Sequence, residues 1–251
     1  MNIAIIGYGW VGKAVHKLFP EAYIYTETQG TKAKVNKADI AFICVPTPLS
    51  EEGNLDTSIV ADIVHWLKCP LIIIRSTVNP GDCNKWEAGW DKQIVYQPEY
   101  LGETPNHPLL DEAKTPFMVL GGSSWNRKKA IDLYTTVYNA NIKIRQVTLE
   151  EAEVIKLTEN RAIAFKMMQM QELYDACELA QIDYYTIRDA VYGDDPRFNL
   201  WFTMIYPEKR GFHNSKCLKK DVPAWSAWAE RNNLNPRLTN ALIEKSKIYG
   251  R

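Results

Sequence analysis

Short apolar runs alternate with amphipathic segments along the first 147 residues of the chain. The runs are rich in Ile, Val, Phe and Tyr and end at glycine, proline or polar residues, a pattern typical of buried β-strands. Apolar residues at helical spacing separate them, as at Val11, Ala14, Val15 and Leu18 and again over 57–68. Strands that alternate with helices predict a parallel, doubly wound sheet. The six predicted strands lie at residues 2–6, 22–27, 39–48, 69–81, 93–103 and 116–122.

The pattern changes after residue 147. Residues 148–181 contain no proline or glycine, and Thr148 with Glu151 three positions later is a capping-box signature. We therefore expect one long helix here and mostly helical structure after it. Its methionines, Met167, Met168 and Met170, are expected to pack in a core. The predicted fold class is α/β: a Rossmann-like, doubly wound parallel sheet over 1–147, followed by an all-α domain over 148–251 built on a long central helix.

Composition narrows the function classes. Lys plus Arg and Asp plus Glu number 30 each in 251 residues, so a net charge of zero gives no electrostatic argument for nucleic acid or an acidic membrane surface. The longest apolar runs are too short to span a bilayer, and the N-terminus lacks the pattern of a secretory signal. Five cysteines without a CxxC pair and four scattered histidines predict no metal site and a reducing, cytoplasmic location.

A glycine-rich loop follows the first predicted strand. Gly7, Gly9 and Gly12 fit GxGxxG and open a helix, which is the context that gives this pattern meaning. The first glycine permits a tight turn, the second lets the backbone approach a pyrophosphate, and the third lets helix and strand pack closely. The helix N-terminus offers unpaired N–H groups to phosphates. The loop therefore predicts dinucleotide binding by Gly7, Tyr8, Gly9, Trp10, Val11 and Gly12.

An acidic residue after the second strand would bind the ribose hydroxyls of the dinucleotide, and Glu27 is the candidate. No arginine follows closely to bind a 2′-phosphate, so the sequence favours NAD over NADP. Lys32 and Lys34 are near enough in sequence to keep NADP open as an alternative.

Six motifs occur in order along nearly the whole chain, and together the chain resembles the nucleotide-sugar 6-dehydrogenases of the UDP-glucose/GDP-mannose type. The motifs are GYGWVG (7–12), VPTP (45–48), RSTVNPG (75–81), PEYLGE (98–103), KLTEN (156–160) and CLKKD (217–221). The resemblance implies oxidation of a sugar primary alcohol to a carboxylate by two hydride transfers, with NAD as cofactor. It also implies that 1–147 is an NAD-binding domain and that 148–251 serves in dimerisation and catalysis.

The resemblance assigns a role to each motif residue. Cys217 is implied as the nucleophile that forms a thiohemiacetal and then a thioester. Lys156 and Asn160 are implied to stabilise the negative oxygen, and Asp221 to support water and the lysine. Thr77 and Glu103 are implied to orient water or transfer protons, and Glu99 to lie near the cofactor and the thioester. The implied cofactor contacts outside the glycine loop are Glu27, Val45, Pro46, Thr47, Ser76 and Thr77.

The residue types support these roles independently. Lys156 and Asn160 are four residues apart on a predicted helix, so they share a face and offer a cation and an amide to an oxyanion. Cys217 lies among Lys216, Lys219 and Lys220, where a helix is expected to begin, and both features favour a thiolate. Ser215 is a candidate cap of that helix. Cys44 and Cys177 lie in apolar segments and are expected to serve packing.

The chain also departs from the family pattern. It ends near the point where the family's nucleotide-sugar-binding third domain would begin, and only residues 28–38 separate the second and third predicted strands. The cysteine loop has Asn214 and Ser215 in place of paired glycines, one extra residue, and Lys219 in place of proline. The family's Asn-Glu pair on the long helix appears as Gln171-Glu172.

Two other functions remain open at the level of sequence. One is a β-hydroxyacid-type dehydrogenase that uses Lys156 and Asn160 without a catalytic cysteine. The other is a truncated, non-catalytic relative that binds NAD or a partner. In either case the expected assembly is a homodimer through the long helix, whose apolar stripe is Val154, Leu157, Ala162, Phe165 and Met168.

Overall fold

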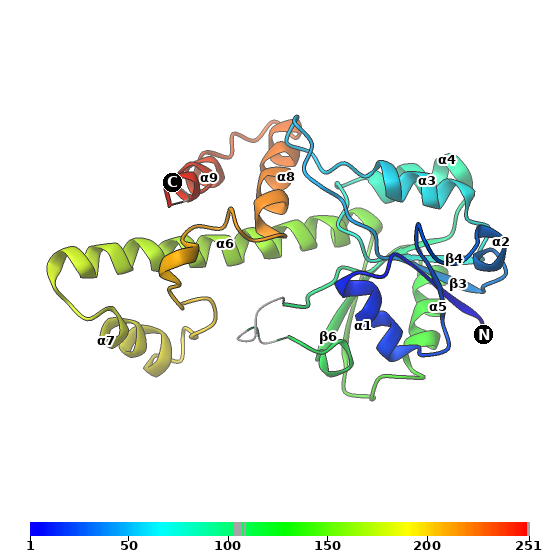
Figure 1. Cartoon of the computed structure of the whole chain (residues 1–251), viewed down its shortest axis with the longest axis horizontal. Helices are drawn as coiled ribbons and strands as arrows, with labels where there is room; N and C mark the ends of the chain where they lie inside the picture. The colour runs from blue at the N-terminus through cyan, green and yellow to red at the C-terminus, as the bar shows by residue number, and fades with distance from the viewer. Residues whose placement is uncertain (103–106, 108, 250–251) are drawn as a thin grey trace. The chain divides into compact units, whose positions relative to one another are not determined.

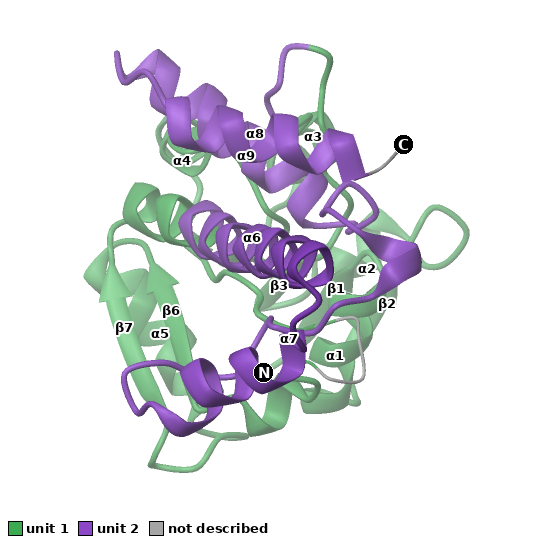
Figure 2. Ribbon diagram, turned by 90° about the vertical axis from the view of Figure 1, so that its left-hand side faces the viewer, with its two compact units in different colours: residues 1–51, 55–156 green, residues 52–54, 157–251 purple. Residues whose placement is uncertain are grey.

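The structure is a computed structural model that describes residues 1–102, 107 and 109–249. The chain divides into two compact units (Figure 2). Unit 1 contains residues 1–51 and 55–156, and unit 2 contains residues 52–54 and 157–251. The division falls inside the long helix, and the domain boundary predicted at residue 147 stays a prediction.

Unit 1 is built on a sheet with helices around it (Figure 1). The described strands of the sheet run in the order β2-β1-β3-β4-β5-β6-β7. Neighbouring strands are parallel except for β5 and β6, which meet at one antiparallel bridge between Tyr96 and Gly121. The strands are β1 (Ile3–Ile6), β2 (Tyr23–Tyr25), β3 (Ile40–Ile43), β4 (Leu71–Ile74), β5 (Ile94–Tyr96), β6 (Phe117–Gly121) and β7 (Lys143–Val147).

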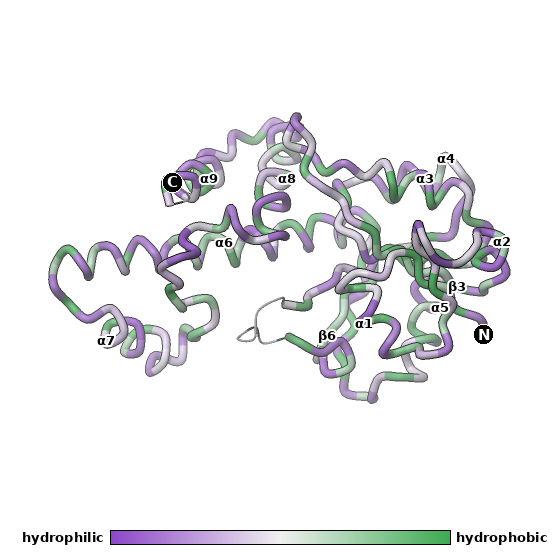
Figure 3. The backbone as a smooth tube through the Cα atoms, in the orientation of Figure 1, coloured by the Kyte–Doolittle hydropathy of each residue, from purple (hydrophilic) through white to green (hydrophobic). Residues whose placement is uncertain are grey.

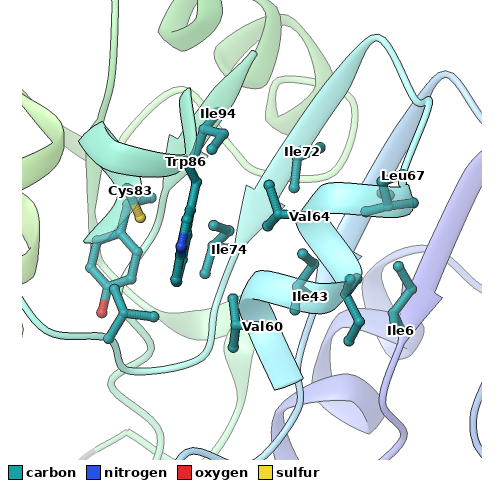
Figure 4. Packing of buried hydrophobic residues seen from close by; sticks show 14 of the residues in the cluster. Ile6, Ile43, Val60, Val64, Leu67, Ile72, Ile74, Cys83, Trp86 and Ile94 are labelled. Carbon is teal, nitrogen blue, oxygen red and sulfur yellow. The ribbon is translucent and has the colours of Figure 1, made fainter. Parts of the chain in front are cut away.

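Both faces of the central strands are covered by helices. Ile72 and Ile74 of β4 pack in the cluster that contains α3 and α4, whereas Leu71 and Ile73 pack in the cluster that contains α1 and α5. Figure 4 shows part of the first cluster, and Figure 3 shows how strongly apolar the chain is along β3. The predicted doubly wound fold is therefore confirmed. The covering helices are α1 (Trp10–Leu18), α2 (Lys32–Val35), α3 (Ser58–Trp66), α4 (Asp82–Trp90) and α5 (Ser124–Tyr134).

The strands differ from the predicted ones in two ways. Each predicted run is longer than the strand. The second, third and fourth runs extend into the loop after the strand, and the second strand ends at Tyr25 rather than at residue 27. The prediction also missed β7, whose sequence is KIRQV and whose residues are exposed or half-buried. An edge strand buries too little surface to impose an apolar pattern on its sequence.

Unit 2 is helical, as predicted. Helix α6 (Leu149–Ala180) begins in unit 1 with the predicted capping box: Thr148 N–H donates to Glu151 Oε2 at 2.8 Å, and Glu151 N–H donates to Thr148 Oγ1 at 3.3 Å. Met168 and Met170 are buried in separate apolar clusters, which confirms the prediction that they serve packing. The other elements are α7 (Tyr184–Arg188), the π-helix η2 (Asp189–Asp194), α8 (Leu218–Arg231) and α9 (Arg237–Tyr249), with short 3-10 turns η1 (Glu112–Lys114) in unit 1 and η3 (Pro207–Lys209) in unit 2.

Glu153 joins the start of α6 to the start of α4 inside unit 1. Its side chain is fully buried, and its carboxylate accepts hydrogen bonds from Gly81 N–H at 2.6 Å and Cys83 N–H at 2.9 Å. Burial raises the pKa of Glu153 to about 7, although the two N–H donors oppose this shift. The carboxylate thus serves as the cap of α4, whose own N-cap residue, Gly81, has no side chain to do so.

This burial predicts a pH-dependent stability. The pKa of Glu153 is higher in the folded state than in the unfolded state, so its contribution is fully present below about pH 4.5 and is lost as the pH rises through about 7. Between pH 5 and pH 8 the loss amounts to about 2 kcal/mol of the free energy of unfolding. We expect Glu153→Gln to remove this part of the pH dependence and to lower the free energy of unfolding most at pH 5, because the amide nitrogen cannot accept one of the two N–H hydrogen bonds.

Chemical denaturation at several pH values between 5 and 8 measures this difference. Glu151→Gln is the matched control, because Glu151 lies two residues away on the same helix but is exposed. The same pH dependence in the wild type and in Glu153→Gln would contradict the prediction.

Candidate active site

The glycine loop lies between β1 and α1, and two of its three glycines are required by close backbone contacts. Gly7 has φ +88°, and a Cβ there would lie 2.5 Å from the carbonyl oxygen of Cys44. A Cβ at Gly12 would lie 2.1 Å from the carbonyl oxygen of Gly7. At Gly9 a Cβ would meet no described atom within 4 Å. The first and third glycines are therefore required by the fold, whereas the second leaves open space beside the backbone.

The start of α1 faces this open space. Gly9 is the N-cap residue of α1 and contributes no side-chain cap. Its neighbours Tyr8 and Trp10 flank the turn; the Tyr8 hydroxyl is hydrogen-bonded to His16 Nδ1 at 2.8 Å, and Trp10 is exposed. Backbone N–H groups at a helix N-terminus, with no Cβ in the way, fit the pyrophosphate of a dinucleotide.

The loops after β3 and β4 lie at the same edge of the sheet, the edge formed by the carboxyl ends of parallel strands. Val45, Pro46 and Thr47 follow β3, and Ser76 and Thr77 follow β4. The Ser76 hydroxyl donates to the carbonyl oxygen of Val45 at 2.7 Å, which ties the two loops together. The order β2-β1-β3 also places the crossover point of the sheet between β1 and β3, where dinucleotides bind in this class of fold.

Asn79 and Asp82 brace the segment that follows VPTP, and the sequence did not reveal their role. Leu55 N–H donates to Asn79 Oδ1, and Asn79 Nδ2 donates to the carbonyl oxygen of Leu55, both at 2.9 Å. Asp82 accepts from Asn79 Nδ2 at 3.0 Å and from the Thr57 hydroxyl at 3.0 Å. The Asn-Pro-Gly sequence at 79–81 predicts a turn. It does not predict the partner of Asn79, because Leu55 lies 24 residues away in the chain.

Glu27 lies two residues beyond the end of β2 and is exposed. The two lysines that kept NADP open each lie against an aromatic ring: Lys32 Nζ is 4.7 Å from the ring centre of Trp66, and Lys34 Nζ is 4.2 Å from that of Tyr23. Each ammonium group thus has an aromatic partner beside β2.

Lys156 is buried in unit 1 and contacts Glu99. Its Nζ donates to the backbone carbonyl oxygen of Glu99 at 2.6 Å and lies 3.3 Å from Glu99 Oε1. The other carboxylate oxygen of Glu99 accepts from Leu101 N–H at 3.1 Å. Burying this ion pair requires both partners, because either charge alone would be costly. Glu103 lies outside the described residues.

Unit 2 contains a second buried charged group, centred on Asp221. The Asp221 side chain is fully buried; its Oδ2 accepts from Asn160 Nδ2 at 2.5 Å, and its Oδ1 lies 2.8 Å from Lys220 Nζ. Asp221 N–H also donates to the carbonyl oxygen of Cys217 at 2.9 Å, so the carboxylate and the cysteine share one helical turn. The structure thus brings together the Asn160, Asp221 and Cys217 predicted from the KLTEN and CLKKD motifs.

Cys217 is half-buried and is the N-cap residue of α8. The hydroxyl of Ser215 accepts a hydrogen bond from Leu218 N–H at 3.1 Å, which confirms the predicted cap. By contrast, burial raises the pKa of Cys44 to about 12 and keeps Cys83 protonated as well. These thiols are unsuited to nucleophilic attack.

The chain is similar in sequence and in structure to known proteins. The family model "UDP-glucose/GDP-mannose dehydrogenase family, NAD binding domain" matches residues 15–141, and the central-domain model of the same family matches residues 150–247. The UDP-glucose 6-dehydrogenase of Rickettsia typhi is 28% identical over 222 residues, which are 84% of this chain and 49% of that protein. The GDP-mannose 6-dehydrogenase of Pseudomonas aeruginosa is 27% identical over 240 residues, 87% of this chain and 53% of that protein.

A solved structure of a UDP-glucose dehydrogenase from Pyrobaculum islandicum matches 98% of this chain and 68% of that one with a TM-score of 0.83 and 20% identity, which supports the fold. The chain spans about half the length of the curated relatives it matches. The match to the NAD binding domain confirms NAD as the predicted cofactor. With both family models matched in order, the chain belongs to the UDP-glucose/GDP-mannose dehydrogenase family.

Proposed function

We propose that this protein oxidises the primary alcohol of a nucleotide sugar, or of a smaller sugar derivative, to a carboxylate. The observation that carries the proposal is the Asp221 group of unit 2, in which a buried carboxylate holds Asn160 and Lys220 one turn from Cys217. We further propose that residues 1–147 act as the cofactor domain and residues 148–251 as the dimerisation and catalytic domain.

The residues of the glycine loop fit NAD, with the pyrophosphate beside Gly9 and the N-terminus of α1, and with Glu27 available to the ribose. Val45, Pro46, Thr47 and Ser76 line the same edge of the sheet. When bound, NAD supplies the acceptor for the two hydrides that leave the substrate. The remaining chemistry belongs to the side chains of the chain.

Cys217 would act once the alcohol has become an aldehyde. Its sulfur attacks the carbonyl carbon, a C–S bond forms, and the carbonyl oxygen takes up the negative charge of a thiohemiacetal. Loss of the second hydride from carbon gives a thioester. Water then attacks the thioester carbon, the C–S bond breaks, and the thiol and a carboxylate are released.

The charged groups would stabilise this oxygen and supply protons. An ammonium and an amide, those of Lys156 and Asn160, are donors suited to a developing oxyanion. Asp221 keeps Asn160 oriented through its short hydrogen bond and balances the charge of Lys220. Glu99 balances Lys156, while Thr77 and Glu103 are proposed to orient water or transfer protons.

We also propose a homodimer through α6. The apolar surface that α6 can offer to a second copy is smaller than the stripe predicted from the sequence. Leu157 and Met168 are buried within the chain, so of that stripe Ala162 is exposed and Val154 and Phe165 are only partly exposed. No described helix is long and apolar enough to cross a membrane. The cytoplasmic location stays a prediction.

We predict that Cys217→Ser abolishes acid formation. With a panel of UDP-, GDP- and ADP-sugars and sugar phosphates, the wild type should form two NADH per sugar. The variant should form at most one and should lose about 10³-fold in the rate of acid release, because a hydroxyl is a far weaker nucleophile without an adjacent base.

Cys69→Ser is the control for the loss of a thiol, because Cys69 lies in the core of unit 1 and donates to the carbonyl oxygen of Val35 at 3.3 Å, a hydrogen bond that a serine hydroxyl can also make. Full acid production by Cys217→Ser would defeat the proposal. One NADH per sugar in the wild type would favour the β-hydroxyacid-type alternative, and NAD binding without any turnover would favour the non-catalytic one.

We predict that Gly9→Ala weakens NAD binding without unfolding the protein. A Cβ at Gly9 meets no described atom, so the fold should tolerate it, but it would fill the space that the pyrophosphate needs. The dissociation constant for NAD, measured by calorimetry, should rise about 10-fold or more, or about 1.4 kcal/mol. Gly89→Ala is the matched control, since it also has open space around it but lies on α4. Equal affinities for all three proteins would refute this assignment of the loop.

We predict a dimer in solution at micromolar concentration, which light scattering measures directly. Phe165→Glu should shift the equilibrium towards monomer, because a carboxylate in a shared apolar surface is costly to desolvate. Ile248→Glu, at an exposed apolar residue of α9, is the control. A monomeric wild type would contradict the proposed dimer.

A further inference from the structure

The segment that leads to Cys217, residues 210–216, is held in place by side chains of helices α6 and α9. Gly211 N–H donates to Gln171 Oε1 of α6 at 2.6 Å, and Phe212 N–H donates to Ser246 Oγ of α9 at 2.9 Å. Both acceptors are buried, with Gln171 5% and Ser246 2% exposed. Two consecutive backbone N–H groups are thus satisfied by side chains that are distant in sequence, at separations of 40 residues for Gly211 and 34 for Phe212.

Gly211 allows this close approach. It has φ +75°, in the left-handed region that favours glycine. A Cβ there would lie 2.8 Å from the carbonyl oxygen of Ser246 and 2.9 Å from its hydroxyl oxygen. The backbone of the segment therefore lies directly against α9.

Arg210 strengthens the attachment with charge. Its Nη2 donates to Asp175 Oδ1 at 2.8 Å and to the carbonyl oxygen of Gln171 at 3.1 Å, and its Nε donates to Gln171 Oε1 at 3.2 Å. Tyr249 of α9 donates to the other oxygen of Asp175 at 2.6 Å, and the guanidinium lies 4.3 Å from the Tyr249 ring centre. Three elements, α6, α9 and the segment itself, share one connected polar network.

Short-range hydrogen bonds carry this attachment on to Cys217. Ser215 N–H donates to the carbonyl oxygen of Phe212 at 3.0 Å, and the Ser215 hydroxyl accepts from Leu218 N–H at 3.1 Å. From Gly211 to Leu218 the chain therefore consists of successive turns. A shift of the backbone at Gly211 would be transmitted to the cysteine, since each turn is tied to the next.

We propose that Gln171 and Ser246 are positioning residues for Cys217: they hold the backbone at Gly211 and Phe212 and so set the place of the thiol at the start of α8. The catalytic meaning of this role rests on the proposed function, whereas the attachment itself does not. Removing either acceptor leaves a buried backbone N–H without a partner, and the segment must move to satisfy it.

Hydrogen–deuterium exchange of the full-length chain tests the attachment without any substrate. In Gln171→Leu and in Ser246→Ala, the amides of residues 211–217 should exchange about 10-fold faster or more than in the wild type. Gln171→Glu keeps the oxygen acceptor and should stay within about 2-fold of the wild type. Thr239→Val is the matched control on α9, because Thr239 is as buried as Ser246 but accepts from Arg161 instead of the segment. Unchanged exchange in Gln171→Leu and Ser246→Ala would overturn the proposal.

The partition between aldehyde and acid tests the catalytic meaning. Oxidation of the alcohol to the aldehyde does not use the thiol, so a misplaced Cys217 slows only the second stage. With a sugar nucleotide that the wild type oxidises, and with semicarbazide to trap free aldehyde, Gln171→Leu should raise the ratio of aldehyde to acid about 10-fold. The rate of the first NADH should change less than about 3-fold, and Gln171→Glu should restore the wild-type ratio.

A general loss of stability would instead lower both stages together and leave the ratio unchanged, which would overturn the positioning role. If the wild type oxidises no sugar in the panel, the proposed function fails, and the exchange rates still decide whether Gln171 and Ser246 hold the segment.

Discussion

Four polar side chains on helix α6 are buried, and the need to satisfy them fixes what that helix contacts. Glu153, Lys156, Asn160 and Gln171 follow one another at spacings that keep them on one side of a helix. A buried polar group without a partner costs on the order of 1–3 kcal/mol, and a buried charge costs more. Each therefore requires a particular partner, and those partners include the start of α4, the loop after β5, the first turn of α8 and the segment before Cys217.

This constraint links the fold to the chemistry. A helix packed only through apolar residues could rotate or slide to another register at small cost, whereas four specific hydrogen-bonding partners remove that freedom. The residues proposed for catalysis are among the ones that carry this specificity. Asp221 illustrates the point, because its carboxylate is satisfied by Asn160 and Lys220 and would be an uncompensated buried charge without them.

The sheet of unit 1 also restricts where the groups of the proposed cofactor site can lie. Its central strands are apolar on both faces and admit little variation, so the functional groups lie in the loops that leave their carboxyl ends. Those loops are braced by polar contacts from other loops, as Ser76 does for Val45 and Asn79 for Leu55. The buried strands and the hydrogen-bonded loops together hold the backbone around the glycine turn in position.

The sequence by itself determined the features that depend on neighbours along the chain. The glycine turn, the capping box of α6, the central strands, the serine cap of α8 and the packing role of the methionines all follow from spacing within a few residues. Strand ends and the edge strand β7 could not be predicted as well, because short and half-exposed strands leave a weak pattern. Only the tertiary structure decided that Glu153 pairs with Cys83, Asn79 with Leu55 and Gln171 with Gly211, since these hydrogen bonds join residues 24 or more positions apart. Local spacing constrains which groups a segment offers, but the pairing of buried groups is settled by the packing that brings distant segments together.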